Sequence, residues 1–276
     1  MHDPGAAGEY ARVVRPLLDA DPVRHTVLLT VLDGLVRDRL PAAHLLTVHD
    51  GGSLVGASLR TPGRCVQVSA MPAAVMPRAE RVLADADPGI DGVAGPIPEA
   101  EAFAAARVAR TACGARVRLR TRLFALGELR PPVGVRGAAR RAVAPDVAML
   151  GRWRHAFELE ERHPGADLPA ATAVVERAVA GGSGELVWED DGVPVSYASA
   201  RPVVAGMSRI GPVYTPPEHR RHGYAAAVTA AAARWALDAG ARTVLLFTDL
   251  ANPTTNALYP RIGFGPVHDS VELSFR

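Results

Sequence analysis

The chain has 276 residues, of which 48% are hydrophobic and 5% aromatic, enough for one large globular domain or two of ordinary size. The net charge is +2 and every basic residue is arginine, with no basic block interleaved with aromatics, which argues against a nucleic-acid partner. The chain lacks a window of about twenty uncharged apolar residues, so no membrane-spanning helix is expected.

The start of the chain and its cysteines predict a cytoplasmic protein. Residues 1–10 lack the basic and then apolar order of a secretory signal. Cys65 and Cys113 lie far apart and lack metal-ligand spacing. We therefore expect two unpaired, buried thiols in a reducing compartment and no metal site.

Residues 1–130 are predicted to form an α/β domain. Residues 1–40 carry apolar positions at helical spacing, and Asp50-Gly51-Gly52 is a hairpin signal. Arg118, Arg120 and Arg122 alternate with apolar residues, which is typical of a half-exposed strand. The pattern predicts strands at 44–49, 54–60, 65–70, 90–97 and 117–126, and helices at 72–86 and 98–111.

Two prolines and a glycine between Leu129 and Gly134 predict a linker at 131–137. The remainder, 138–276, has a normal domain length. A hairpin is predicted around Asp191-Gly192. The other predicted elements are a strand at 140–146, helices at 147–162, 169–180 and 225–239, strands at 208–215 and 243–250, a helix that starts at Asn252, and a final strand.

The stretch from Gly211 to Ala225 has the order of a strand, a polar loop and a helix N-terminus. The first amides of a helix have no partner within it, and the helix dipole favours an anion there. Gly223 lets the backbone approach a ligand closely, and Arg220 and Arg221 add positive charge. We expect a pyrophosphate to bind here, although a capped helix with a solvated face would give the same pattern.

A second signature follows this loop. Asn252-Pro253 predicts a helix cap with proline at the first helical position. The helix then carries Asn256 and Tyr259 on one face and ends near Gly263-Phe264. In this order and spacing the chain resembles the GNAT superfamily of acyl-CoA-dependent N-acyltransferases. Arg220-Arg221-His222-Gly223-Tyr224-Ala225 is similar to that family's pyrophosphate loop, and the resemblance is specific from 208 to 264.

The resemblance implies a GNAT fold, in which a mixed central sheet is flanked by helices, and acetyl-CoA as the acyl donor. It implies that the strand at 208–215 separates from the next strand and pairs with the pantetheine arm. A backbone amide of Val213 or Tyr214 would polarise the thioester carbonyl, because Pro212 has no N–H. The implied cofactor contacts are Val213, Thr215, Arg220, Arg221, His222, Gly223, Tyr224, Ala225, Ala226, Asn252 and Asn256.

Tyr259 is the candidate general acid. Its spacing alone favours a tyrosine that packs by its ring, whereas the resemblance implies a proton donor to the departing thiolate. Pro260 removes a helical hydrogen bond directly beside it. The sequence names no general base, because 208–215 has no carboxylate. The remaining candidates are Asp249, Glu158, Glu161, His163 and water relays.

The first half contains a weak echo of the second. In the first half, a helical run follows Gly95-Pro96 and leads to Cys113-Gly114-Ala115-Arg116. In the second half, a helix follows Gly211-Pro212 and leads to Ala239-Gly240-Ala241-Arg242. One hypothesis is a tandem of two GNAT-like halves in which the first is degenerate and has lost acyl-CoA binding. The alternative is two unrelated α/β halves.

The sequence is compatible with three functions. The first is an acetyl-CoA-dependent N-acetyltransferase, a monomer or homodimer that acts on a primary amine of a small molecule. The acceptor could be an aminoglycoside-like amine, a polyamine, an amino acid or a peptide N-terminus. The second is an acyl-CoA-binding sensor or regulatory module without turnover. The third assigns the function to the first half, as a substrate-covering or dimer-forming domain.

Overall fold

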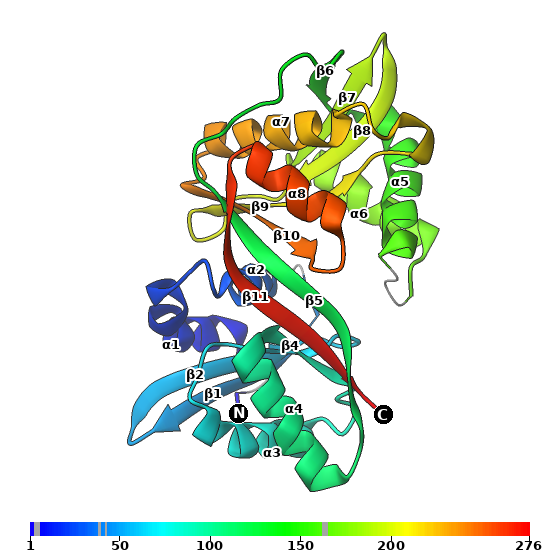
Figure 1. Cartoon of the computed structure of the whole chain (residues 1–276). Helices are drawn as coiled ribbons and strands as arrows, with labels where there is room; N and C mark the ends of the chain where they lie inside the picture. The colour runs from blue at the N-terminus through cyan, green and yellow to red at the C-terminus, as the bar shows by residue number, and fades with distance from the viewer. Residues whose placement is uncertain (3–5, 38–39, 42, 162–164) are drawn as a thin grey trace. The chain divides into compact units, whose positions relative to one another are not determined.

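The computed structural model describes residues 1–2, 6–37, 40–41, 43–161 and 165–276 (Figure 1). The chain divides into two compact units that are not continuous in sequence. The first comprises 1–122, 249–251 and 268–276, and the second comprises 123–248 and 252–267. His163, one of the candidate bases, lies outside the described residues.

Both units are mixed sheets flanked by helices, as the sequence predicted. Two long strands, β5 (Ala115–Leu126) and β11 (Phe264–Phe275), contribute residues to each unit. The other elements of the first unit are α1 (Ala7–Ala20), α2 (Thr26–Val36), β1 (His44–Asp50), β2 (Ser53–Arg60), β3 (Val66–Val68), a 3₁₀ turn (Ala73–Val75), α3 (Met76–Ala86), β4 (Gly92–Pro96) and α4 (Ile97–Thr111).

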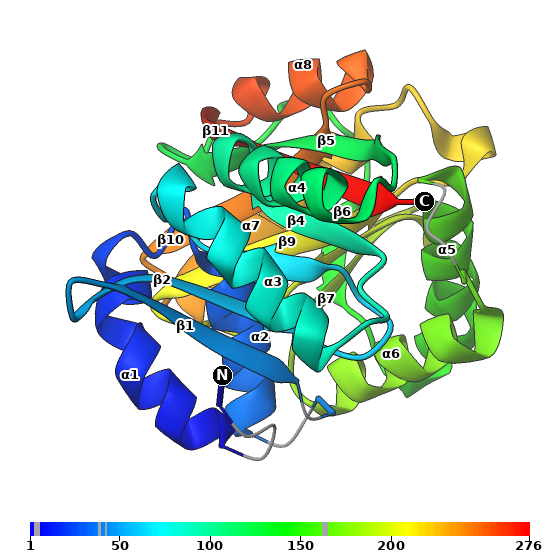
Figure 2. The same cartoon turned by 90° about the horizontal axis from the view of Figure 1, so that it is seen from below.

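The sheet of the first unit has the order β1-β2-β3-β4-β11-β5. The pairs β1–β2, β2–β3 and β4–β11 are antiparallel, and β3–β4 is parallel. Helices α3 and α4 cover one face (Figure 2). Leu83 and Phe103 of these helices pack with Val66 and Val93 of the sheet. On the other face α1 is fixed by Tyr10, whose hydroxyl donates to the carbonyl of Ser58 at 2.9 Å. Burial on both faces explains why these strands are nearly continuous apolar runs.

Three of the four arginines of β5 are paired with carboxylates. Within the first unit, Arg118 forms an ion pair with Glu272 at 2.9 Å and Arg120 with Glu101 at 3.1 Å. Arg122 forms a bidentate pair with Asp269, at 2.7 and 2.9 Å. The row is therefore a half-exposed sheet face whose charge is largely neutralised within the first unit.

The second unit contains the remaining elements. They are β6 (Ala138–Arg141), a 3₁₀ turn (Ala144–Asp146), α5 (Val147–Glu160), α6 (Leu168–Ala180), β7 (Gly184–Asp190), β8 (Val193–Ala200), β9 (Met207–Tyr214), a 3₁₀ turn (Pro217–His219), α7 (Tyr224–Asp238), β10 (Thr243–Asp249) and α8 (Pro253–Arg261). From β5 outward the strand order is β5-β10-β9-β8-β7-β6. The pairs from β6 to β9 are antiparallel and β9–β10 is parallel.

Local sequence signals account for several of these boundaries. Asp191 and Gly192 both have positive φ, which is the requirement of the tight β7–β8 hairpin turn, as predicted. The Asn252 side chain accepts from the amides of Thr254 and Thr255, at 3.2 and 3.3 Å, which confirms the predicted cap of α8. Asp167 caps α6 in the same way.

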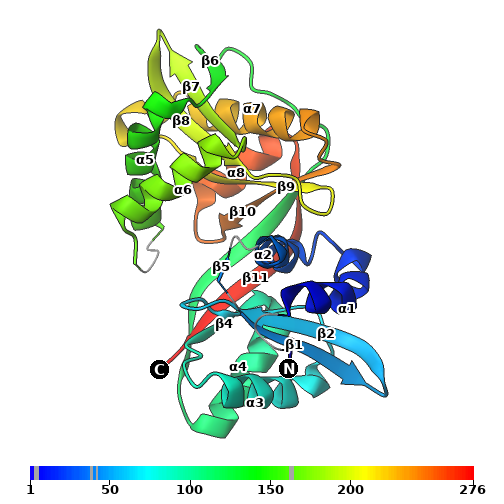
Figure 3. The same ribbon diagram turned by 180° about the vertical axis from the view of Figure 1, so that it is seen from behind.

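The sheet of the second unit has two distinct faces (Figures 1 and 3). One side, which we call the α7 face, packs with the alanine-rich helix α7 and with α8. Its strand residues include Leu186, Ala200, Ile210 and Leu246. Val187 and Tyr197 pack with Leu150 of α5 and Val175 of α6, and we call this side the α5 face. Because side chains alternate along a strand, this division assigns a face to every residue of these strands.

The element order is repeated in the two units. The series α1-α2-β1-β2-β3-α3-β4-α4-β5 matches the series α5-α6-β7-β8-β9-α7-β10-α8-β11. In each series the parallel pair, β3–β4 or β9–β10, is joined through one helix. The echo predicted at Gly95-Pro96 is therefore out of register. That dipeptide ends β4, the counterpart of β10, whereas Gly211-Pro212 lies in β9, the counterpart of β3.

The last strands of the two series are exchanged. Residues 270–274 of β11 pair with 92–96 of β4, in the first unit. Conversely, β5 is the neighbour of β10, and its Phe124 lies in the core of the second unit. Each unit is therefore completed by a strand from the other half of the sequence.

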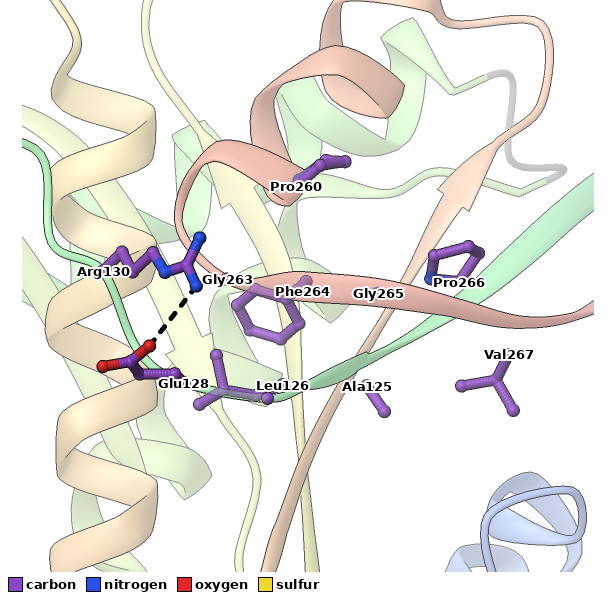
Figure 4. A pocket seen from close by; sticks show the side chains of 11 residues that line it. Ala125, Leu126, Glu128, Arg130, Pro260, Gly263, Phe264, Gly265, Pro266 and Val267 are labelled. Atoms are coloured by element: carbon purple, nitrogen blue, oxygen red, sulfur yellow. Dashed lines mark hydrogen bonds and ion pairs between the residues drawn. The ribbon is translucent and has the colours of Figure 1, made fainter.

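A close backbone approach fixes the start of β11. Gly263 has φ +102°, and a Cβ there would collide with the carbonyl oxygen of Glu128. The Gly127 amide donates to the carbonyl of Gly263 at 3.0 Å and the Arg130 amide to that of Ile262 at 3.1 Å. Figure 4 shows the surface pocket at this crossing, where Glu128 and Arg130 form an exposed ion pair. The glycine of the Gly263-Phe264 signature is thus required by packing.

We predict that Gly263→Ala destabilises the protein by about 3 kcal/mol or more, because it adds left-handed strain to a clash with fixed backbone. Thermal unfolding followed by circular dichroism measures the change. Gly265→Ala is the matched control, since a Cβ at Gly265 meets nothing within 4 Å. Equal melting temperatures for the two variants would contradict the packing role of Gly263.

Candidate active site

The site begins where strands β9 and β10 stop pairing. Their parallel register runs from Met207 opposite Thr243 to Ile210 opposite Leu246, and ends there. On its other edge β9 stays paired with β8 as far as Val213 and Tyr214. Pro212, two residues beyond the last pair, has no N–H to donate to a neighbouring strand, which fits the end of β9–β10 pairing. The separation of these strands, which the family resemblance implied, is therefore present.

Val213 and Tyr214 lie in this separated part of β9. Successive residues of a strand direct their N–H groups to opposite edges, so one of these two amides points toward the β10 side. Tyr214 packs against Trp153 of α5, with ring centroids 6.4 Å apart. Thr215 follows directly, and its hydroxyl lies 2.8 Å from that of Ser196. The strand end that carries the candidate carbonyl donor is thus held by side-chain contacts on both sides.

The loop from Thr215 to Gly223 has the backbone of an anion cradle. Arg221 has φ +68° and Gly223 has φ +86°, and α7 begins at Tyr224. Such left-handed residues before a helix turn successive N–H groups toward one point. A Cβ at Gly223 would lie 3.0 Å from Val135, so the position has little room for a side chain. These features fit a pyrophosphate at the start of α7.

The charged side chains of the loop differ in their availability. Arg220 donates from Nε to the carbonyl of Thr215 at 2.9 Å, and its Nη2 donates to both carboxylate oxygens of Glu160 in α5, at 2.7 and 2.9 Å. Its guanidinium therefore holds the loop in shape. Arg221 is exposed and forms no ion pair with the described residues. His222 stacks on Tyr224, whose hydroxyl donates to Asp190 at 2.6 Å, so these rings brace the start of the helix.

A pocket of about 560 Å³ extends from this loop between α7 and α8. Gly223 and Ala226 form one wall and residues 130–133 form another. The wall from α8 consists of Thr254, Ala257, Leu258, Arg261 and Ile262. Apolar side chains with two guanidinium groups, Arg130 and Arg261, suit a long ligand that carries phosphates.

Helix α8 contributes the three polar residues of the second signature. Asn252 caps the helix, and Asn256 accepts from the hydroxyl of Thr248 at 2.6 Å, which ties α8 to the end of β10. Tyr259 is buried, with its ring 6.1 Å from that of Phe264 and 6.5 Å from that of Phe124. Helix α8 continues through Pro260 to Arg261. The proline therefore does not break the helix at the tyrosine.

Burial raises the pKa of the Tyr259 phenol, and the carboxylate of Glu161 raises it further. The phenol therefore stays protonated at every pH near neutrality. This is the form that a hydrogen-bond donor or general acid requires.

The candidate bases have other partners. Glu158 forms an ion pair with Arg154 at 3.1 Å, and Asp249 accepts from the Ala251 amide at 2.8 Å. A buried carboxylate that the sequence analysis missed is Glu185, on the α5 face. It accepts from the hydroxyls of Tyr197 and Ser199, the latter at 2.6 Å, and burial raises its pKa. A glutamate within the apolar run of β7 was the signal that could have revealed it.

The two cysteines differ from the prediction in their burial. Cys65 and Cys113 are unpaired but only partly buried, so the expectation of buried thiols is wrong. No group of His, Cys, Asp and Glu among the described residues could hold a metal ion. Of the helices that the structure describes, none has the length and apolarity to cross a membrane.

Residues 150–264 match the acetyltransferase (GNAT) family, so the second unit carries a domain of that family. No curated protein matches the sequence of the chain. Similar solved structures include GCN5-related N-acetyltransferases from Kribbella flavida (20% identity, TM-score 0.58, 91% of this chain and 95% of that one) and Sphaerobacter thermophilus (18%, 0.61, 89% and 85%). A tandem GNAT protein from the clavulanic acid biosynthesis pathway is also similar (16%, 0.55, 90% and 87%).

At these identities the likeness shows the fold. Because the alignments cover about nine tenths of the chain, they include the first unit, whose fold is therefore also GNAT-like. Together with the repeated element order, this supports the tandem arrangement over two unrelated halves.

We predict that the wild-type protein binds acetyl-CoA in isothermal titration and that Gly223→Asp weakens binding at least tenfold, about 1.4 kcal/mol. The new carboxylate would crowd Val135 and repel the pyrophosphate. Gly240→Asp is the matched control, because Gly240 has φ +90° at the other end of α7 and open space around it. Equal affinity in both variants would remove the pyrophosphate from this loop.

Proposed function

We propose that the protein is an acetyl-CoA-dependent N-acetyltransferase that acetylates a primary amine of a small molecule by direct attack in a ternary complex. The observation that carries this proposal is the end of β9–β10 pairing at Ile210, followed directly by the positive-φ loop at the start of α7. One ligand can then reach from the loop to the separated strands. The proposed contacts are Val213, Thr215, residues 220–226, Asn252 and Asn256, and Arg220 takes part through its backbone because its guanidinium is engaged by Thr215 and Glu160.

The reaction balances without a metal or redox cofactor. The amine nitrogen bonds to the acetyl carbonyl carbon and the carbon–sulfur bond breaks. An ammonium acceptor loses two protons overall, of which one ends on the sulfur of CoA and one goes to solvent. The chain must therefore polarise the carbonyl, accept a proton and stabilise the thiolate.

Backbone and side chain divide two of these tasks. The amide of Val213 or Tyr214 that points toward β10 donates to the developing oxyanion in a region shielded by α5 and α7. Tyr259 donates a hydrogen bond to the departing sulfur. The pKa of the phenol lies above that of a thiol, about 8.5, so the phenol stabilises the thiolate mainly as a hydrogen-bond donor. Transfer of its proton to the sulfur depends on how the two groups are positioned in the complex. Phe124 and Phe264 fix the ring in place.

Acyl-CoA binding is assigned to the second unit alone. The counterpart of its loop in the first unit is the stretch 69–75 before α3. That stretch has no glycine, and Pro77 sits in the first turn of α3, where it removes an N–H. The first unit thus lacks one helix-start amide and the glycine that permits close approach in the second unit, which supports a degenerate first half.

A sensor or regulatory module without turnover is the second candidate. The observation that favours it is the absence of a carboxylate from 207–214 of β9, which leaves proton removal to water or to a more distant group. The unpaired cysteines fit a reducing, cytoplasmic setting in either case. A monomer or homodimer is proposed for both.

We predict that Tyr259→Phe lowers kcat roughly 10²-fold while the Kd for acetyl-CoA stays within twofold, because the variant keeps the ring and loses the donor. Thiol release and isothermal titration measure the two quantities. Tyr10→Phe, a buried tyrosine of the first unit, is the control and should leave both unchanged. Acetyl-CoA binding by a wild type that acetylates no amine would support the sensor instead.

A further inference from the structure

Two arginines lie side by side on the α5 face of the second unit. Arg201 follows β8 directly, and its amide donates to the carbonyl of Arg209 in β9 at 3.0 Å. Their neighbours Ala200 and Ile210 belong to the α7 face. Because side chains alternate, Arg201 and Arg209 both project from the α5 face.

Arg201 is exposed and Arg209 is half-buried, and neither guanidinium group is paired with a counter-charge among the described residues. Nη1 of Arg209 is buried without a hydrogen-bond partner. The Arg209 guanidinium instead lies over the ring of Phe247, 6.0 Å from its centroid. Burial, and then the positive charge of Arg201, lower the pKa of Arg209 to about 9. An anion would relieve both effects.

The neighbouring charges leave this place positive. Arg154 of α5 lies near enough to raise the local potential, and it is paired with Glu158. Glu185 is the nearby carboxylate, but its two oxygens accept from Tyr197 and Ser199. Burial also raises the pKa of Glu185, which disfavours its charged form. Arg201 and Arg209 thus keep unused donors.

The arginine pair lies next to the separated strands. Arg209 is opposite Leu245, one step before the last paired residues Ile210 and Leu246. Phe247, under its guanidinium, is the first residue of β10 beyond that pairing. A ligand group held by Arg209 would therefore sit within a few residues of the backbone proposed to hold the thioester.

We propose that Arg201 and Arg209 bind a carboxylate carried by the molecule that reacts at this site, so that the acceptor is an amino-acid-like amine. The inference rests on the proposed function and names its substrate class. Guanidinium groups bind carboxylates in fixed, often bidentate geometry. The same positive field disfavours polycationic acceptors and lowers the pKa of an incoming ammonium group, which helps a site without a strand carboxylate.

The test uses matched acceptors with acetyl-CoA and thiol release as the readout. L-alanine and γ-aminobutyrate are compared with their carboxamides and with spermidine. We expect kcat/KM for one of the amino acids to exceed that of its carboxamide at least roughly tenfold, mainly through KM. Arg209→Gln and Arg201→Gln should reduce this ratio to about one. Arg234→Gln, an exposed arginine of α7, should keep it.

A second arm separates the two possible sources of the carboxylate. Succinyl-CoA is compared with acetyl-CoA on the carboxamide acceptors. A preference for succinyl-CoA that Arg209→Gln abolishes would move the carboxylate from the acceptor to the acyl chain, and would overturn the acceptor assignment. Turnover of acetyl-CoA without a carboxylate preference in either arm would overturn the arginine site while leaving the transferase intact.

Thermal shift keeps the test valid if no turnover occurs. Free γ-aminobutyrate and L-alanine should raise the melting temperature of the wild type and of Arg234→Gln, but not of Arg209→Gln. If the amino acids raise the melting temperature but the protein does not bind acetyl-CoA, the result would count against the proposed function alone. No shift with either amino acid, in a folded protein that does not turn over, would overturn the arginine site.

Discussion

The architecture of the second unit depends on one local loss of pairing. β9 must leave β10 after Ile210, yet remain part of the sheet through β8, because only then does one edge of its backbone become available to a ligand. Pro212 contributes by removing an N–H at this point. The loop and α7 follow directly, so the free strand edge and the amides at the helix start belong to one continuous segment.

The two units show how one element order can serve different ends. Both have a parallel strand pair joined through a helix, but the connection in the second unit carries two left-handed residues, one of them a glycine, whereas residues 69–75 of the first contain neither. Exchange of β5 and β11 completes each unit with a strand from the other half of the sequence. Phe124 of β5 accordingly packs in the core that contains Tyr259.

The sequence has no lysine, so arginine supplies its permanent positive charge, and the roles of the arginines are set by their partners. Arg122 and Arg140 are neutralised by carboxylates and act in packing. Arg220 is held by Glu160 and shapes the loop rather than presenting its charge. Arg201 and Arg209 differ because neither forms an ion pair with a carboxylate of the described residues, and the buried, unpartnered Nη1 of Arg209 is costly unless a ligand compensates for it.

Much of the fold and part of the candidate site could be predicted from the sequence, where the determining residues are adjacent in the chain. The Asp191-Gly192 turn, the Asn252 cap and the loop before α7 are of this kind, since backbone preference and capping act within a few residues. Only the tertiary structure decided the register of the repeat, the strand exchange, the collision that requires Gly263, and the meeting of Arg201 with Arg209. These depend on which distant segments pair, and strand pairing is specified by burial across the whole sheet rather than by local sequence.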